Sequence, residues 1–396
     1  MEALIKDPAQ MDPMMPPEGQ RQLEDLAFEL VSKASSLAGR MSPIVTTAVG
    51  ELVRSMNCYY SNLIEGHSTR LRDINRALRQ DYASEPERRK LQVEAVAHIE
   101  VQQAIDEGRD EPAEPTSRAY TMWLHSEFCK RLPEDSLWLE DKATNRIIRI
   151  APGEFRDGEV AVGRHLPPPF ETLPDFFAKF ESAYRSDGLS RVRQVIAIAA
   201  AHHRFVWIHP FYDVNGRVAR LMSHAILKRL GIGSALWSVS RGLARNVDRY
   251  KSLLMAADQP EKRPTAGKQL SSEGLVNFCQ FFLDVCLDQI EFMGSVLAPS
   301  ELARRMEIYA EDEIRANRLP KGSFTLLREA LLAGEFERGA APSITGYKER
   351  MARNVLSKLL ELGLLTSTGP KAPVRLGFPV AVIERWFPSL FPANAI

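Results

Sequence analysis

The twelve residues HPFYDVNGRVAR, positions 209–220, place groups for acid–base, metal and anion chemistry next to one another. His209 can take a proton from a hydroxyl near neutral pH. Asp213 offers the hard oxygen ligand that Mg²⁺ prefers. Arg217 and Arg220 are three residues apart, so both guanidinium groups can reach one polyphosphate. These are the groups needed to transfer a phosphorus-centred group.

The surrounding sequence predicts how these side chains are placed. Residues 190–207, SRVRQVIAIAAAHHRFVW, carry apolar residues at helical spacing. Helix is disfavoured at His209 because Pro210 follows it, which puts the histidine on a connecting loop. A second helix is predicted to begin near Asn215. Its first amides lack internal partners, so Asn215 and Gly216 would form a phosphate cradle.

A second stretch, SNLIEG at positions 61–66, is by itself an ordinary helix terminus. Ser61 and Glu65 are four residues apart and share one helical face. Gly66 is placed to end the helix, because glycine accepts the left-handed conformation common at that position.

The stretch HPFYDVNGRVAR resembles the signature of the Fic family, His-x-Phe-x-Asp/Glu-Gly-Asn-Gly-Arg-x-x-Arg. Most Fic proteins transfer AMP from ATP to a hydroxyl side chain of a target protein. The chain departs from the signature at Val214, where the family usually has glycine, and a β-branched residue restricts the backbone there. The matching residues are His209, Phe211, Asp213, Asn215, Gly216, Arg217 and Arg220.

The resemblance also implies roles for individual residues. His209 would be the general base, Asp213 would hold Mg²⁺, residues 215–220 would bind the phosphates of ATP, and Val214 would also border the nucleotide. Residues 155–165 resemble the family's flap, which aligns the target segment by strand addition. Other residues expected to border the nucleotide are Val162, Gly163, Arg164 and His165, and, in RNVDRYKSLLMAAD, Tyr250 and Asp258.

SNLIEG resembles the inhibitory helix, Ser/Thr-x-x-x-Glu-Gly/Asn, of the self-inhibited N-terminal class of the family. The resemblance places this helix at about residues 52–66 and implies that Glu65 pairs bidentately with Arg220. That arginine would otherwise take the γ-phosphate of ATP. A carboxylate there would also repel the incoming phosphate, so ATP would bind in an unproductive pose.

Composition bounds the class of protein. A chain of 396 residues is long for one core and suggests two or three domains. Lys plus Arg equal Asp plus Glu at 51 each, which argues against general steering of nucleic acid but leaves room for a local basic face. Four cysteines without a CxxC pair favour a reducing compartment. With no signal peptide or membrane span in the sequence, we expect a soluble cytoplasmic protein.

The predicted fold is mainly α: a Fic helical core with a small β-hairpin flap, and a C-terminal winged-helix-like domain. Short β-branched runs on either side of the turn RDGE, residues 156–159, predict the hairpin. The predicted units are an N-terminal helical region at 1–110, the core at 111–295, a linker helix at 296–319 and the winged-helix-like domain at 320–396.

The sequence of the last unit, residues 320–396, is compatible with more than one kind of binding partner. Two helical patterns followed by the strand-like LLTSTGPKAPVRLGF are typical of a winged helix. The start of its last helix is basic, with Lys348, Arg350 and Arg353, so docking to DNA is one use. Three acidic residues dilute that face and favour docking to protein or a structural role: Glu349, Glu361 and Glu384.

The leading hypothesis is a self-inhibited protein adenylyltransferase that uses ATP and Mg²⁺ to modify Ser, Thr or Tyr hydroxyls of a target protein. The protein could also modify its own hydroxyl side chains, and it could form a homodimer through the N-terminal region. Transfer of UMP or phosphocholine, and removal of AMP with Glu65 positioning a water, stay open. The rival from another class is a DNA-binding regulator whose Fic core only senses nucleotide. A metal hydrolase using His202, His203 and His209 lacks a carboxylate to complete its ligand set.

Overall fold

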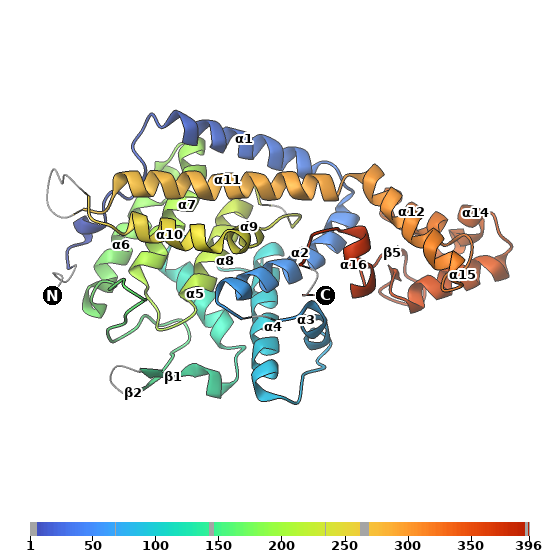
Figure 1. Ribbon diagram of the computed structural model, residues 1–396, viewed down its shortest axis with the longest axis horizontal. Helices are drawn as coiled ribbons and strands as arrows, with labels where there is room; N and C mark the ends of the chain where they lie inside the picture. Colours follow the sequence, from blue (N-terminus) through green and yellow to red (C-terminus); the bar gives the residue numbers. More distant parts are fainter. Residues whose placement is uncertain are drawn as a thin grey trace.

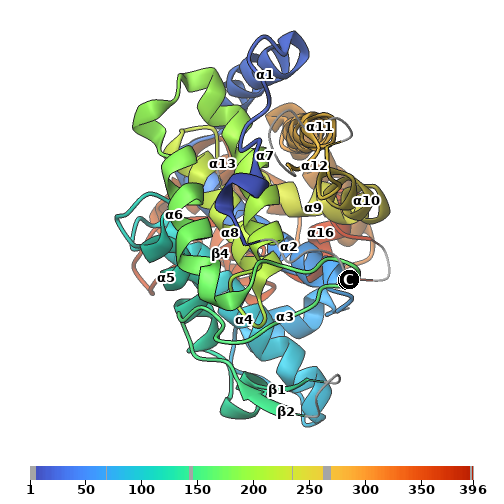
Figure 2. The same cartoon turned by 90° about the vertical axis from the view of Figure 1, so that its left-hand side faces the viewer.

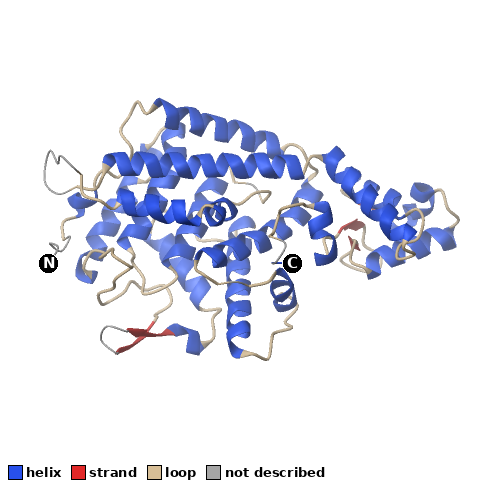
Figure 3. Ribbon diagram, in the orientation of Figure 1, coloured by secondary structure: helices blue, strands red, loops and turns tan. Residues whose placement is uncertain are grey.

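The structure is a computed structural model that describes residues 6–67, 69–141, 146–233, 235–261, 269–392 and 395. Helices form most of it, and short strands make two small sheets, shown in red in Figure 3. This confirms the prediction of a mainly α fold. The helices up to the end of the long α11 are α1 (Arg21–Ala38), α2 (Pro43–Ile64), α3 (Leu71–Ala77), α4 (Pro86–Asp106), α5 (Arg118–Cys129), α6 (Leu173–Ala183), α7 (Arg191–Ile208), α8 (Asn215–Arg229), α9 (Val239–Arg245), α10 (Val247–Ala257) and α11 (Ser272–Val296).

The helix pair α7 and α8 lies at the centre of the molecule. Helix α7 is buried along nearly its whole length because alanines let its neighbours α1, α8 and α11 approach closely. Helices α4, α5 and α9 pack around α8, and α2 packs on α4 and α9. Figure 1 shows α1 and α11 side by side along the upper edge, above α7. The core therefore holds the loop between α7 and α8 from several sides.

Helix α2 has clear start and stop signals. Pro43 is its first residue, and the hydroxyl of Ser42 accepts a hydrogen bond from the amide of Val45. The helix ends at Ile64, with Glu65 as the capping residue, and Gly66 follows in the left-handed conformation at φ 84°. The sequence predicted this ending, and it leaves the side chain of Glu65 at the end of the helix.

The hairpin lies elsewhere than the sequence predicted. It is formed by β1 (Trp138–Asp141) and β2 (Arg146–Arg149), which pair antiparallel and lie at the lower edge in Figures 1 and 2. The expectation that strands flank RDGE is wrong, because residues 156–165 contain only the single bridge Val162–His165. Pro152 and Gly153 turn the chain soon after β2, and Gly153 has a φ angle of 85°. RIIR therefore pairs with the strand before it in the sequence and not with residues after it.

The C-terminal residues form a second group of elements. The strands β3 (Glu335–Phe336), β5 (Val374–Leu376) and β4 (Leu365–Thr366) make an antiparallel sheet in that order. After α16 (Val380–Trp386) the chain returns to the N-terminal part, where the ring of Phe391 packs on those of Tyr59 and Tyr60 in α2. The elements are α12 (Pro299–Arg315), α13 (Ser323–Ala333), β3 (Glu335–Phe336), α14 (Ala341–Thr345), α15 (Glu349–Glu361), β4 (Leu365–Thr366), β5 (Val374–Leu376) and α16 (Val380–Trp386).

The described residues contain no helix with the length and apolar character needed to cross a membrane. The four cysteines are buried free thiols.

Candidate active site

The loop between α7 and α8 has a strained but well-braced backbone. His209 and Val214 both adopt positive φ angles, 50° and 68°. Such a conformation is uncommon for a β-branched residue and is easy for glycine. At Val214 this gives a physical reason why the Fic signature has glycine. The amide side chain of Asn215 clamps the loop, since it accepts from the amide of Phe211 at 3.0 Å and donates to its carbonyl at 2.8 Å.

The imidazole of His209 is suited to accept a proton at neutral pH. Burial lowers the pKa of His209 to about 4, and the nearby charges of His165 and Arg156 lower it further, while the carbonyl of Val206 and the carboxylate of Glu65 act in the opposite direction. Nδ1 lies 3.4 Å from that carbonyl, and a proton held there leaves Nε2 as the acceptor. The ring is therefore neutral over the physiological range.

Arg220 is held by the end of helix α2. Its Nη2 lies 2.5 Å from Oε1 of Glu65, and its Nε donates to the hydroxyl of Ser61 at 2.9 Å. The resemblance implied a bidentate pair between Glu65 and Arg220. The structure differs, because Ser61 takes the second guanidinium donor and leaves the carboxylate a single contact. Ser61 and Glu65, the two polar residues singled out in the SNLIEG stretch, thus bind the same arginine.

The carboxylate of Glu65 also lies over the first turn of α8. A Cβ added to Gly216 would stand 2.6 Å from Oε1 of Glu65, so only glycine leaves room for it. Burial raises the pKa of Glu65, but the charge and hydrogen bond of Arg220, with Arg217 and His67 behind, outweigh it and the net pKa is lowered. The anion position at the N-terminus of α8 is therefore filled by an ionised carboxylate of the same chain.

Arg217 has a different carboxylate partner, which sequence reasoning missed. Its Nη2 lies 2.8 Å from Oε2 of Glu94, in the middle of α4, and both side chains are buried. The guanidinium lies over the ring of Phe128 at 5.3 Å, and Nδ1 of His67 is 3.1 Å from Nη2. A signal for Glu94 was present: α4 has polar residues at a spacing of four, Glu94, His98 and Gln102, and all three are buried.

The carboxyl group of Asp213 is exposed beside the loop and accepts from the amide of Val214 at 2.6 Å. One or two carboxylates with substrate phosphates are the usual donor set for Mg²⁺ in nucleotide sites, so Asp213 fits this ion. Among the described residues there is no cluster of three His, Cys, Asp or Glu that could hold a metal without a substrate. His202 instead meets Ser223 and Tyr250 in the core, which removes it from a hydrolase ligand set.

The remaining predicted nucleotide residues divide into two groups. Val162, Gly163, Arg164 and His165 form the single-bridge turn, and Nε2 of His165 lies 2.6 Å from the carbonyl of Trp207, near the end of α7. Tyr250 is buried with its hydroxyl on His202 and lies near Arg220, whose charge acts to lower the pKa of the phenol while burial raises it. Asp258 lies 3.2 Å from Nε2 of His203.

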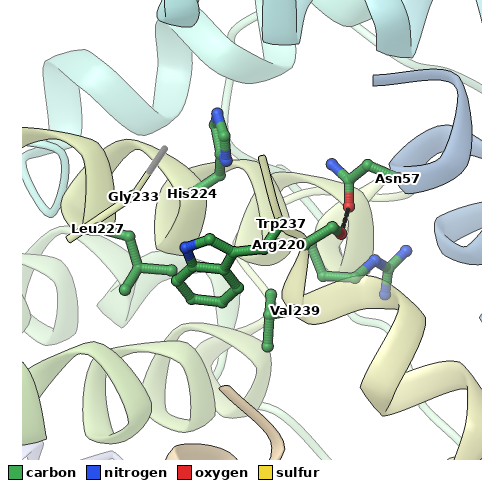
Figure 4. A pocket seen from close by; sticks show the side chains of 8 residues that line it. Asn57, Arg220, His224, Leu227, Gly233, Trp237 and Val239 are labelled. Carbon is green, nitrogen blue, oxygen red and sulfur yellow. Dashed lines mark hydrogen bonds between the residues drawn. The ribbon is translucent and has the colours of Figure 1, made fainter. Parts of the chain in front are cut away.

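A small cavity lies beside Arg220, at the α8 and α9 side (Figure 4). Its volume is about 10 Å³, roughly the space of one water molecule. Asn57 and Ser238 close it with a hydrogen bond, drawn as the dashed line. This cavity is too small for a nucleotide.

Part of the chain is similar in sequence to known proteins. Residues 115–227 match the model of the Fic/DOC family. The curated "Protein adenylyltransferase Fic" of Drosophila erecta is 38% identical over 98 residues, 25% of this chain and 20% of that protein. The protein of the same name from Drosophila yakuba is 34% identical over 131 residues, 33% of this chain and 26% of that protein. The matched part of the chain thus spans only about a fifth to a quarter of the length of these relatives.

Solved structures show the same fold over a larger part of the chain. A Fic family protein from Desulfovibrio desulfuricans G20 has a TM-score of 0.51 and 18% identity, and the match covers 89% of this chain and 96% of that one. A Fic domain containing signaling protein from Bacteroides thetaiotaomicron has a TM-score of 0.50 and 19% identity, with 68% and 95% covered. These matches identify residues 115–227 as a Fic domain. Glu65 and Glu94 both lie outside the matched residues 115–227.

Proposed function

We propose that the chain is a protein adenylyltransferase, which transfers AMP from ATP to a Ser, Thr or Tyr hydroxyl of a target protein, and that Glu65 inhibits it. The observation that carries the proposal is the position of the Glu65 carboxylate, bound to Arg220 and lying over Gly216 at the start of α8. A nucleotide phosphate would need the same arginine and the same helix end.

The proposed reaction uses the neutral imidazole of His209. Its free nitrogen takes the proton of the target hydroxyl, the hydroxyl oxygen bonds to the α-phosphorus of ATP, and the bond from that phosphorus to the bridging oxygen breaks, so pyrophosphate leaves. Arg217 and Arg220 bind phosphate oxygens, and Asp213 would hold Mg²⁺, which neutralises phosphate charge when bound. The bracing of the loop by Asn215 keeps the imidazole in place during these steps.

Inhibition follows from competition for Arg220. While the carboxylate holds the guanidinium, the γ-phosphate of ATP lacks its partner and meets a negative charge. A preference of about 2.7 kcal/mol for the paired state is enough to lower activity about a hundredfold. The charge of Glu65 persists at neutral pH because its pKa is lowered by Arg220.

Transfer of label from α-labelled ATP tests the proposal. We expect Glu65→Gly to incorporate much more label into itself and into added proteins than the wild type, and Glu65→Gly with His209→Ala to incorporate none. Glu361→Gly is a matched control, since Glu361 also ends a helix shortly before a left-handed glycine, Gly363, but lies in α15. Equal signal in wild type and Glu65→Gly would contradict inhibition by Glu65.

A further inference from the structure

The side chain of Arg156 links the two segments that would meet the target hydroxyl. It is 3% exposed and its guanidinium donates to three backbone carbonyls. Nε donates to the carbonyl of His209 at 2.9 Å, Nη1 to that of Gly158 at 2.8 Å and Nη2 to that of Pro168 at 2.5 Å. The backbone amide of Arg156 also donates to the carbonyl of Pro210 at 2.9 Å.

These acceptors belong to two separate parts of the chain. His209 and Pro210 form the start of the loop that carries the base. Gly158 and Pro168 lie near the beginning and just after the end of the flap, residues 155–165. One guanidinium therefore closes the flap segment on itself and fastens it to the base-bearing residue. A planar fork with five N–H donors can do this, whereas a lysine ammonium is a single point with a different geometry.

The same two segments are joined a second time at the surface. The hydroxyl of Tyr212 donates to Oδ1 of Asp157 at 2.7 Å. Gly158 leaves space for this contact, because a Cβ there would lie 2.7 Å from the tyrosine oxygen. The inner link through Arg156 and the outer link through Tyr212 therefore enclose the RDG turn from both sides.

The surroundings of Arg156 suit a geometric role more than an ion pair. Its carboxylate neighbour Glu159 is 3.8 Å away, and the side chain of Glu159 is 58% exposed. Burial lowers the pKa of Arg156, so the charge is costly where it stands. Carbonyl dipoles of the loop and flap hold the guanidinium, which means that loop and flap must keep their positions for it to be satisfied.

We propose that Arg156 is a positioning residue that sets the left-handed backbone of His209 and the path of the flap as one unit, with Tyr212 and Asp157 as its outer support. The unit places the base and the target-aligning segment at a fixed separation. This proposal rests on the proposed function. Arg217 and Arg220, which would bind the phosphates, make no contact with Arg156, and only residues 162–165 at the end of the flap are expected to border the nucleotide, so KM for ATP should change less than kcat.

The test measures AMP incorporation against ATP concentration in the Glu65→Gly protein and in the same protein with Arg156→Lys. We expect kcat to fall roughly tenfold to a hundredfold, because misplacing the reacting groups by about 1 Å has that size of effect, while KM for ATP changes less than threefold. Arg149→Lys is the matched control, since Arg149, the last residue of β2, has a side chain that is 48% exposed and pairs with Glu134. It should leave both constants unchanged.

Tyr212→Phe keeps the proposal testable if Arg156→Lys fails to fold. It removes one exposed hydroxyl and should lower kcat severalfold without changing KM. An unchanged kcat in either folded variant, or a fall that appears only in KM for ATP, would overturn the positioning role. If the Glu65→Gly protein itself incorporates no AMP, the proposed function fails instead, and the two failures are distinguished by that parent protein.

Discussion

The two arginines of the site are each paired with a glutamate from outside the matched family residues, but the two pairs differ in construction. In the pair Arg220–Glu65, the arginine side chain is 1% exposed and the carboxylate 35% exposed. In the pair Arg217–Glu94, both side chains are 6% exposed. Glu65 caps the end of α2, whereas Glu94 lies in the middle of α4.

This difference indicates which pair can open. A helix terminus next to a left-handed glycine can fray at low cost, so Glu65 can leave Arg220 without unfolding its helix. Removing Glu94 from Arg217 would require moving the middle of a packed helix, or leaving a buried charge alone. We therefore interpret Glu65 as the part that competes with phosphate and Glu94 as a fixed anchor that keeps Arg217 in place.

The largest effect expected is on stability, from Glu94→Ala. Breaking one side of a buried ion pair costs about 3–5 kcal/mol, because the partner charge stays buried without compensation. The free energy of unfolding from urea titration should fall by that amount in Glu94→Ala. A loss below about 1 kcal/mol would show that the two pairs do not differ as the burial indicates, and Glu107→Ala, an exposed acid one residue beyond the end of α4, serves as the control.

Activity should respond to the two glutamates in opposite directions. Glu65→Gln removes the competing charge and should raise AMP incorporation above wild type. Glu94→Gln, made in the Glu65→Gly protein, should lower incorporation and raise KM for ATP, because Arg217 loses the partner that orients it over Phe128. A rise in activity with Glu94→Gln would mean that Glu94 is a second brake, and the proposed contrast would be wrong.

The smallest effect expected is the pH dependence of the Glu65 contact. The pKa of Glu65 in the folded protein lies below its ordinary value of 4.5, so its contribution to stability is complete above that pH and is lost as the pH falls through the folded pKa. The contribution itself should be about 1 kcal/mol or less, because the carboxylate is partly exposed. Thermal unfolding of wild type and Glu65→Gln should therefore differ by a constant amount from pH 6 to pH 8. A difference that changes across that range would contradict the lowered pKa.

The sequence predicted the parts of the site that lie in short continuous stretches. The ending of α2 at Glu65 and Gly66 and the start of α8 at Asn215 follow from capping rules and from the proline after His209. Glu94 and Arg156 could not be assigned roles, because their partners are 123 and 53 residues away and only the packing of α4 and of residues 155–165 brings them together. The hairpin was misplaced because RIIR pairs with the preceding WLED, residues 138–141, which has no β-branched residue to mark it as a strand.

Intact mass of the purified protein after incubation with ATP tests the central claim, that Glu65 and a phosphate of ATP compete for Arg220. Wild type and Glu65→Gly should be compared side by side. The account predicts that Glu65→Gly gains the mass of one or more AMP units while the wild type keeps its original mass. Equal masses for the two proteins, whether both gain AMP or neither does, would contradict it.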